Sequence, residues 1–417
     1  MTPTSTPRAA AAPPAAPGGA PGAVISVAVM AHPRRLDRAR ELAAAFPQWP
    51  ATVAVDPEPD GPPTTLRAAR AAWAGMPARA THHLVLQDDV VLCRDFAARL
   101  AAAVAARPEH PLALYANWNA WNGSATRAAA LAGADWVAAV PGEWTPSLAL
   151  LLPRADVLAL LAAIPADSAE QTPDDIVLHR ELTARGRQVL ISVPHLVEHL
   201  GDLSLIGNDA YGPRHSACFA DRTGPAAGAT PRDPATGARY PRWQPWESSP
   251  YAPTLLVHLH RGEAHAVLAT PDGPRHLTVV EYLRGTGLAD AATRAHRERT
   301  GELPGQPTEY PGLRAELWYA GYLLGITAPP DGPAPGDPVV RAALRTLALG
   351  GTNSLGPVRR WADQHADRLT ELVADGVAAG RTHRRRNGPP TALTPSRTAA
   401  LAPAEEIWQR TPVPEET

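Results

Sequence analysis

Two adjacent carboxylates follow a short apolar run in the stretch His82-His-Leu-Val-Leu-Gln-Asp-Asp-Val-Val-Leu92. The run 83–87 predicts a buried strand, so Asp88 and Asp89 would lie where that strand ends, and strand ends are where ligands bind in open α/β sheets. An unpaired carboxylate is costly to bury. The pair therefore either faces solvent in a turn or binds a cation, and the residues alone leave both possibilities open.

The elements that must position these carboxylates alternate in type. Short apolar runs and Ala- and Leu-rich helical segments follow one another from Val24 to Val193. This βαβ pattern predicts an α/β fold with an open, doubly wound, mostly parallel sheet. The expected strands are 24–30, 51–55, 83–87, 112–115 and 188–193. The expected helices are 34–46, 64–76, 96–106, 154–163 and 174–185.

The remainder of the chain divides by composition. Residues 1–22 predict a disordered tail, 23–218 the α/β domain, and the Pro- and Gly-rich segment 219–249 a linker or long loop. Residues 250–387 predict a mainly helical C-terminal region that opens with a hairpin, and 388–417 a Pro-rich tail. The arginines between 381 and 387 are interpreted as a solvated helix end, with an anion site as the alternative.

Composition limits the function classes. The 417 residues carry a formal net charge of -2, which does not favour nucleic-acid binding. Two cysteines, Cys93 and Cys218, are too few for a disulfide framework. The N-terminus lacks a signal-peptide pattern, and no apolar run has the roughly 20 residues that span a bilayer. We expect a cytoplasmic protein. The many Arg, Ala and Pro residues without any Lys are typical of a high-GC bacterial genome.

Three stretches together resemble the nucleotide-sugar-dependent glycosyltransferases of the GT-A fold. They are Val24-Ile-Ser-Val-Ala-Val-Met-Ala-His-Pro-Arg-Arg, His83-Leu-Val-Leu-Gln-Asp-Asp-Val, and Pro194-His-Leu-Val-Glu-His-Leu-Gly-Asp-Leu-Ser-Leu-Ile-Gly. The resemblance covers residues 24 to 210, about half of the chain, and includes nothing after Ala220.

The resemblance implies a divalent cation, Mn or Mg, that bridges the two phosphates of a nucleoside diphosphate sugar. Asp89 would be the main metal ligand, His199 a late metal ligand, and Asp88 would lie nearer the donor ribose or sugar. His195 is expected to be packed instead. Gln87 departs from the family pattern, which usually has an acidic residue at this position. The loop 201–207 is expected to close over the phosphates.

Donor contacts are expected at neighbouring strand ends and at the helix start that follows. A turn with a cation, a carboxylate for a ribose hydroxyl or base imide, and an arginine near a helix N-terminus are suited to a nucleotide. The candidate donor-binding residues are His32, Arg34, Asp56, Thr65 and Arg67; Arg70 is interpreted as part of a solvated helix face.

Acceptor chemistry needs a base if the enzyme inverts configuration. Thr172-Pro173-Asp174-Asp175 is a helix-start pattern at the place where the family usually carries that base, so Asp175, then Asp174, are the candidate catalytic residues. Stabilisation of the helix dipole is the alternative reading of both. Aromatic residues with amide neighbours are suited to a sugar. The candidate acceptor or sugar contacts are Asn117, Trp118, Trp121 and Trp144.

These features predict a hexosyltransferase-type enzyme that uses a UDP-sugar as its expected donor. A nucleotidyltransferase is the nearest alternative, but it would need a Gly-rich phosphate loop with a Lys, and the chain has neither. A non-catalytic nucleotide- or sugar-binding protein on the same fold is the other alternative. Gln87 favours that reading, whereas Asp89, Asp175 and His199 together argue against it.

Overall fold

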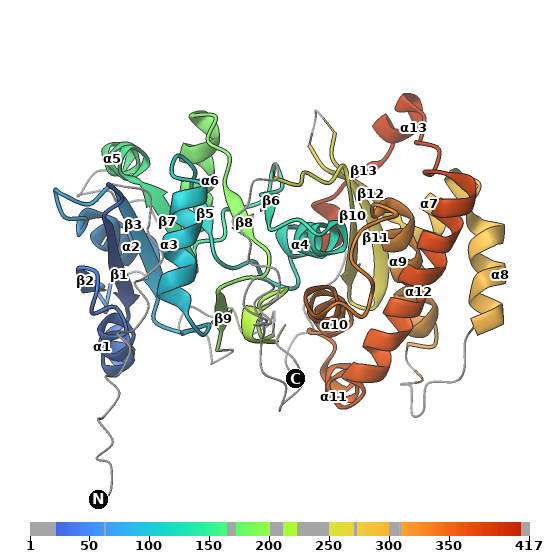
Figure 1. The fold of residues 1–417 in the computed structure, drawn as a ribbon, viewed down its shortest axis with the longest axis horizontal. Coiled ribbons are helices and arrows are strands. Elements are labelled where there is room, and N and C mark those ends of the chain that lie inside the picture. Colours follow the sequence, from blue (N-terminus) through green and yellow to red (C-terminus); the bar gives the residue numbers. More distant parts are fainter. Residues whose placement is uncertain are drawn as a thin grey trace, which may run out of the picture.

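The computed structural model describes residues 22–61, 64–164, 172–200, 212–222, 250–270, 273–299, 308 and 310–409. The described chain forms two large sheets with helices around each and a small two-stranded sheet, and α4 lies between the two large sheets (Figure 1). Within these residues no helix is both long enough and apolar enough to span a bilayer. The predicted phosphate loop 201–207, the N-terminal tail 1–21 and most of the predicted linker lie outside the described residues.

The first half contains a seven-stranded sheet in the order β2-β1-β3-β7-β5-β8-β6. The α/β class is confirmed, but the sheet is mixed and not mostly parallel, because β7 runs antiparallel to both of its neighbours and β6 runs antiparallel to β8. The strands are β1 (Ile25–Ala31), β2 (Ala51–Val55), β3 (His82–Gln87), β5 (Leu112–Ala113), β6 (Trp136–Ala138), β7 (Ala149–Pro153) and β8 (Leu190–Ser192).

Helices cover both faces of this sheet because its strands are apolar on both sides. On β3, Val85 packs in one core, whereas Leu84 and Leu86 pack in the core on the opposite face. The surrounding elements are η1 (Pro33–Arg35), α1 (Leu36–Ala44), α2 (Leu66–Ala74), α3 (Phe96–Ala106), α4 (Trp121–Ala132), α5 (Arg154–Ala163), α6 (Asp174–Ala184) and η3 (Ala220–Arg222).

A separate two-stranded ribbon extends from the end of β3. Its strands β4 (Val90–Leu92) and β9 (Val197–His199) are antiparallel, and Val90 pairs with His199. This register brings a late segment of the chain directly beside the acidic pair. The nitrogen of Leu200 donates to the Asp89 carbonyl oxygen at 3.0 Å and continues the pairing.

The C-terminal region is helical around a sheet of its own. The predicted hairpin is present, and two further strands complete an antiparallel sheet in the order β10-β11-β12-β13. Residues 395–409, predicted as part of a tail, form β13 and two short helices instead. The elements are β10 (Leu255–His260), β11 (Glu263–Leu268), β12 (Arg275–Thr278), α7 (Val279–Gly285), α8 (Ala289–Arg299), α9 (Leu313–Thr327), α10 (Pro338–Gly351), α11 (Gly356–Gln364), α12 (Ala366–Asn387), α13 (Pro395–Ala399), β13 (Ala402–Pro403) and α14 (Glu406–Gln409).

Helices α9 and α12 pack against one another through glycines spaced four residues apart. A Cβ on Gly321 or Gly325 would come within 3.0 Å of a backbone carbonyl oxygen of α12, and a Cβ on Gly376 or Gly380 would meet the backbone of α9 equally closely. Only glycine therefore permits this interhelical distance.

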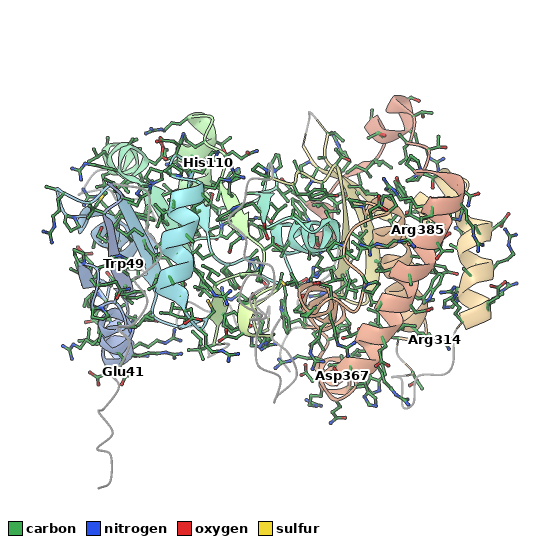
Figure 2. The ribbon with its side chains drawn as sticks, viewed as in Figure 1. Glu41, Trp49, His110, Arg314, Asp367 and Arg385 are labelled. Carbon is green, nitrogen blue, oxygen red and sulfur yellow. The ribbon has the colours of Figure 1, made fainter. Side chains whose placement is uncertain are left out.

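Two of the four arginines near the end of α12 bind helix ends, so the prediction of a solvated helix end is wrong for these two. Arg384 donates to the carbonyl oxygens of Ile326 and Thr327 at the end of α9, at 2.6 and 3.0 Å. Buried Arg381 donates to the Leu131 carbonyl oxygen at the end of α4, at 2.8 Å, and joins the two halves. Both cations satisfy carbonyl groups left open at helix C-termini. Arg385, labelled in Figure 2, is exposed and donates to a carbonyl oxygen in the loop after α9, and Arg386 is exposed as well.

Candidate functional site

The acidic pair lies in the turn between β3 and β4. Asp88 and Asp89 are both buried, with 6% and 9% of their surface exposed. Asp88 contacts the chain that leaves β1, because the Asp88 Oδ2 atom accepts the backbone N–H of His32 at 2.9 Å. Burial raises the pKa of Asp88, although this hydrogen bond opposes the shift.

Arg35 lies between the two carboxylates. Its Nη1 is 3.2 Å from Asp88 Oδ1 and 2.8 Å from Asp89 Oδ2, and its side chain is only 16% exposed. Burial lowers the pKa of Arg35, but its bonds and charge contacts with the two carboxylates outweigh that effect and raise the pKa above its usual value. Arg35 is the last residue of the first stretch that resembles the glycosyltransferases, but no role was predicted for it.

His199 reaches the same carboxylate from β9. Its Nε2 lies 3.5 Å from Asp89 Oδ2, and burial lowers the pKa of this imidazole. The other oxygen of Asp89, Oδ1, is buried and has no hydrogen-bond partner among the described residues. The β4–β9 pairing therefore brings the predicted site residues Asp89 and His199 together. The Oδ1 atom of Asp89 can accept a hydrogen bond from a ligand.

The residues as they lie do not fit a divalent cation. In the described part of the chain, no group of three or more His, Cys, Asp and Glu side chains is gathered in a way that could hold a metal ion. Arg35 takes an oxygen of each carboxylate, where the metal of the predicted site would be. The Mn or Mg site remains a prediction.

Three strand ends bring the predicted donor contacts to one edge of the sheet. Strands β2, β1 and β3 are parallel, so their C-terminal ends meet there. Asp56 at the end of β2 accepts two hydrogen bonds from Arg67, at 3.2 and 3.3 Å, so these two candidates neutralise one another. Arg34 is exposed at this edge, and His32 accepts the N–H of Arg34 on its Nδ1 at 3.2 Å. Arg70 lies apart from the site, because its Nε donates to the Ile164 carbonyl oxygen at 2.8 Å.

The antiparallel strand β7 brings a further segment to the same edge. Ala149 pairs with Leu86, and the nitrogen of Gln87 donates to the Leu148 carbonyl oxygen at 3.0 Å. Leu148 therefore lies beside the residue that precedes the acidic pair, and the segment 144–148 leads into β7 at this edge. The exposed Trp144, with 42% of its surface accessible, lies in this segment.

The two candidate bases differ in environment. Asp174 is buried and accepts hydrogen bonds from the hydroxyls of Thr65 and Ser147, which indicates a structural role. The same Thr65 oxygen accepts the Asp174 N–H at 3.1 Å, so Thr65 anchors α6. Asp175 is partly accessible, and burial raises its pKa to about 6. The environments therefore favour Asp175 over Asp174 as a base.

The start of α6 contacts the segment that enters β7, because the Thr145 N–H donates to the Asp175 carbonyl oxygen at 3.3 Å. The positive charge of Arg214 lowers the pKa values of both Asp175 and His199, as a secondary cause after burial. The Arg214 carbonyl oxygen accepts a hydrogen bond from the Tyr115 hydroxyl. No motif marked this residue in the sequence. The arrangement places a candidate base, a cation and two carboxylates at one sheet edge.

The predicted aromatic pocket is largely wrong. Trp118 and Trp121 are only 5% and 3% exposed and belong to the cores on either side of α4. Trp118 donates its Nε1–H to the Pro213 carbonyl oxygen at 2.9 Å, and Asn117 Oδ1 accepts the Asn119 N–H at 3.0 Å. The amides that suggested a polar surface cap the backbone around α4, and of the three predicted tryptophans only Trp144 is exposed.

Replacing a buried and an exposed tryptophan should change the free energy of unfolding by different amounts. We expect Trp118→Ala to lower the free energy of unfolding by about 3–5 kcal/mol, because it leaves a cavity in the core. Trp144→Ala should cost less than about 1 kcal/mol, because the ring is exposed. Urea unfolding followed by circular dichroism measures both. Equal losses would contradict the assignment of Trp144 to the surface.

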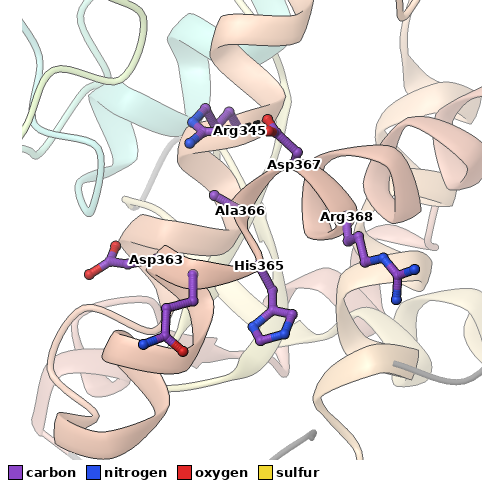
Figure 3. A pocket seen from close by; sticks show the side chains of 7 residues that line it. Arg345, Asp363, His365, Ala366, Asp367 and Arg368 are labelled. Atoms are coloured by element: carbon purple, nitrogen blue, oxygen red, sulfur yellow. Dashed lines mark hydrogen bonds and ion pairs between the residues drawn. The ribbon is translucent and has the colours of Figure 1, made fainter. Parts of the chain in front are cut away.

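A hollow lies far from this edge, where α10, α11 and α12 meet (Figure 3). Arg345 and Asp367 in its wall form an ion pair at 2.5 Å. Its other lining residues are Asp363, Gln364, His365, Ala366 and Arg368. Its charges are mixed, and it contains none of the predicted site residues.

Comparison with known proteins adds no family to this geometry. A scan with protein-family models found no match to the chain, and a search among curated proteins found none either.

Proposed function

We propose that this protein is a glycosyltransferase that moves a sugar from a nucleoside diphosphate sugar to an acceptor hydroxyl. One observation carries the proposal. The ends of β1, β2 and β3 bring Asp88 and Asp89 to one edge of the sheet, and the segment that enters β7 beside this edge contacts the start of α6, where the Thr145 N–H donates to the Asp175 carbonyl oxygen at 3.3 Å. A donor-binding region and a base at one edge are what sugar transfer requires.

In this proposal the donor lies across the ends of β1 and β3, with UDP as the expected nucleotide. Among the described residues nothing bonds to the buried Oδ1 of Asp89, so this oxygen can accept a hydrogen bond from a hydroxyl of the donor. Arg35 and Arg214 supply positive charge as the diphosphate leaves. Positive charge held in place at a leaving diphosphate stabilises the transition state without reorganisation.

The acceptor binds beside Trp144 and Asp175 in the proposed reaction. The acceptor oxygen forms a bond to the anomeric carbon of the donor sugar while the bond from that carbon to the phosphate oxygen breaks. Asp175 takes the hydroxyl proton, and the nucleoside diphosphate leaves with the electron pair. A base on the acceptor side belongs to an inverting reaction. Trp144 supplies an accessible ring face on which a sugar can stack.

A cytoplasmic location is part of this proposal. Both cysteines are buried free thiols, which is typical of a reducing compartment. Nucleoside diphosphate sugars would be available to the protein there.

Binding calorimetry with UDP, GDP and UMP tests the donor site. Wild type should bind one diphosphate at least tenfold more tightly than UMP, and Asp88→Asn should weaken that binding at least tenfold. Asp37→Asn is the matched control, because the Asp37 carboxylate on neighbouring α1 is 95% exposed and should not affect binding. No binding of UDP or GDP by wild type would contradict the proposed donor site.

A further inference from the structure

The acidic pair already holds a cation that belongs to the chain. Arg35 Nη1 lies 2.8 Å from Asp89 Oδ2 and 3.2 Å from Asp88 Oδ1, so one nitrogen serves both carboxylates. All three side chains are largely buried, at 16%, 9% and 13% exposure for Arg35, Asp88 and Asp89. The contact is therefore shielded from solvent, whereas the ion pair of Arg40 with Asp37 on the following helix α1 is exposed.

A guanidinium in this position competes with a divalent cation for the same oxygens. Mg, Mn and similar hard ions bind carboxylate oxygens at roughly 2.0–2.6 Å. A metal at Asp88 Oδ1 and Asp89 Oδ2 would displace Arg35 or lie against its positive charge. An arginine does not lose its proton in proteins, so it cannot reduce this repulsion by becoming neutral.

The charges of this turn do not accommodate both cations together. Gln87, which occupies the position before the acidic pair, is neutral, so the turn contains two carboxylates and no third. With both carboxylates ionised, a divalent ion that joined Arg35 would give the turn one net positive charge. Excess charge in a buried site is strongly unfavourable, so a metal ion could bind here only by displacing Arg35 from its two partners.

We propose that Arg35 is the resident cation of Asp88 and Asp89 and excludes divalent metal from them. Donor binding by this protein is then independent of metal, a consequence that rests on the proposed function. Arg35 positions the two carboxylates and contributes the charge that a metal ion would otherwise supply.

Titration with Mn²⁺ alone tests the exclusion, with the free-ion signal followed by electron paramagnetic resonance. Wild type should not bind Mn²⁺ at 1:1 stoichiometry in the range of about 0.1–1 mM, a range typical of weak carboxylate sites. Arg35→Gln should bind at least tenfold more tightly, and Arg35→Gln with Asp89→Asn should lose that binding. Arg40→Ala, which removes an exposed arginine of α1, is the matched control and should behave as wild type.

Mn²⁺ binding by wild type as tight as by Arg35→Gln would overturn the proposal, as would a folded Arg35→Gln that binds no Mn²⁺. If Arg35→Gln does not fold, Mn²⁺ titration of wild type and of Arg35→Lys still tests the proposal. Both keep a positive charge at position 35, so Mn²⁺ binding by either would overturn the exclusion of divalent metal.

Nucleotide binding supplies the second measurement. UDP affinity of wild type should agree within twofold in the presence of EDTA and of Mn²⁺, and Arg35→Gln should bind at least tenfold more weakly in EDTA. UDP binding that disappears in EDTA would overturn metal independence. Failure to bind UDP or GDP under both conditions would overturn the proposed function instead, and the Mn²⁺ titration would still decide the role of Arg35.

Discussion

Gly325→Ala should lower the free energy of unfolding by about 3 kcal/mol, the upper part of the range for overpacked cores. The added methyl group would come within 3.0 Å of the Val377 carbonyl oxygen, which belongs to the backbone of α12 and cannot rotate away. Helix α9 must then move away from α12, although the two pack along their lengths in the core of the C-terminal region. Denaturant unfolding measures the loss.

Gly336→Ala provides the control, because nothing lies within 4 Å of a Cβ at that position and its backbone is not in the left-handed region. We expect it to change stability by less than about 0.5 kcal/mol. If Gly325→Ala were equally mild, α9 and α12 would not be in contact through their glycines. Gly380→Ala should resemble Gly325→Ala, because its Cβ would meet the Tyr322 carbonyl oxygen from the other side of the same interface.

Asp175→Asn should reduce sugar transfer about 10³-fold, a typical loss for a general base. The wild-type rate should also depend on pH. Burial raises the pKa of Asp175 to about 6, and a base acts only when ionised. The rate should therefore be constant above pH 7 and fall tenfold per pH unit well below pH 6. Rate measurements from pH 4.5 to 8 at saturating donor test this limb.

Asp175→Asn should change the pH–rate profile as well as the transfer rate, because the acidic decline of the profile comes from protonation of Asp175. Residual transfer by Asp175→Asn should no longer decline below pH 6, whereas Glu181→Gln on the same α6 helix should retain both the rate and the limb. Unchanged transfer in Asp175→Asn would remove Asp175 from the reaction. In that outcome Asp174 would not replace it, since its carboxyl group is fully engaged with Thr65 and Ser147.

Local sequence signals predicted much of the fold. The expected bounds of β2, α3 and α5 coincide with the structure, because each is a regular apolar pattern with clear ends. The segment of α4 was interpreted as a sugar-binding pocket. The amides beside the tryptophans suggested a polar surface. Instead, the Glu143 carboxylate accepts the N–H groups of Trp121 and Asn122 at 2.8 and 2.5 Å. A side chain about twenty residues further along the chain therefore caps the N-terminus of α4.

The contacts that complete the site depend on packing between distant segments, which periodicity does not reveal. Strand β7 was not among the expected strands, yet its antiparallel pairing with β3 brings Leu148 beside Gln87. Arg35 ends the first stretch of the resemblance but had no predicted role, and its partner Asp89 is 54 residues away in the sequence. Arg214 lies outside the three stretches of the resemblance, 15 residues after His199. Asp88, Asp89 and His199 could be predicted because strand ends and a resemblance marked them.

Release of nucleoside diphosphate from a panel of UDP- and GDP-sugars, measured in EDTA with an acceptor mixture, tests the central claim most directly. Wild type should release UDP or GDP from at least one donor, and Asp175→Asn should release it about 10³-fold more slowly while still binding the nucleotide. Binding without release from any donor would contradict transferase activity and make the chain a nucleotide- or sugar-binding protein on this fold.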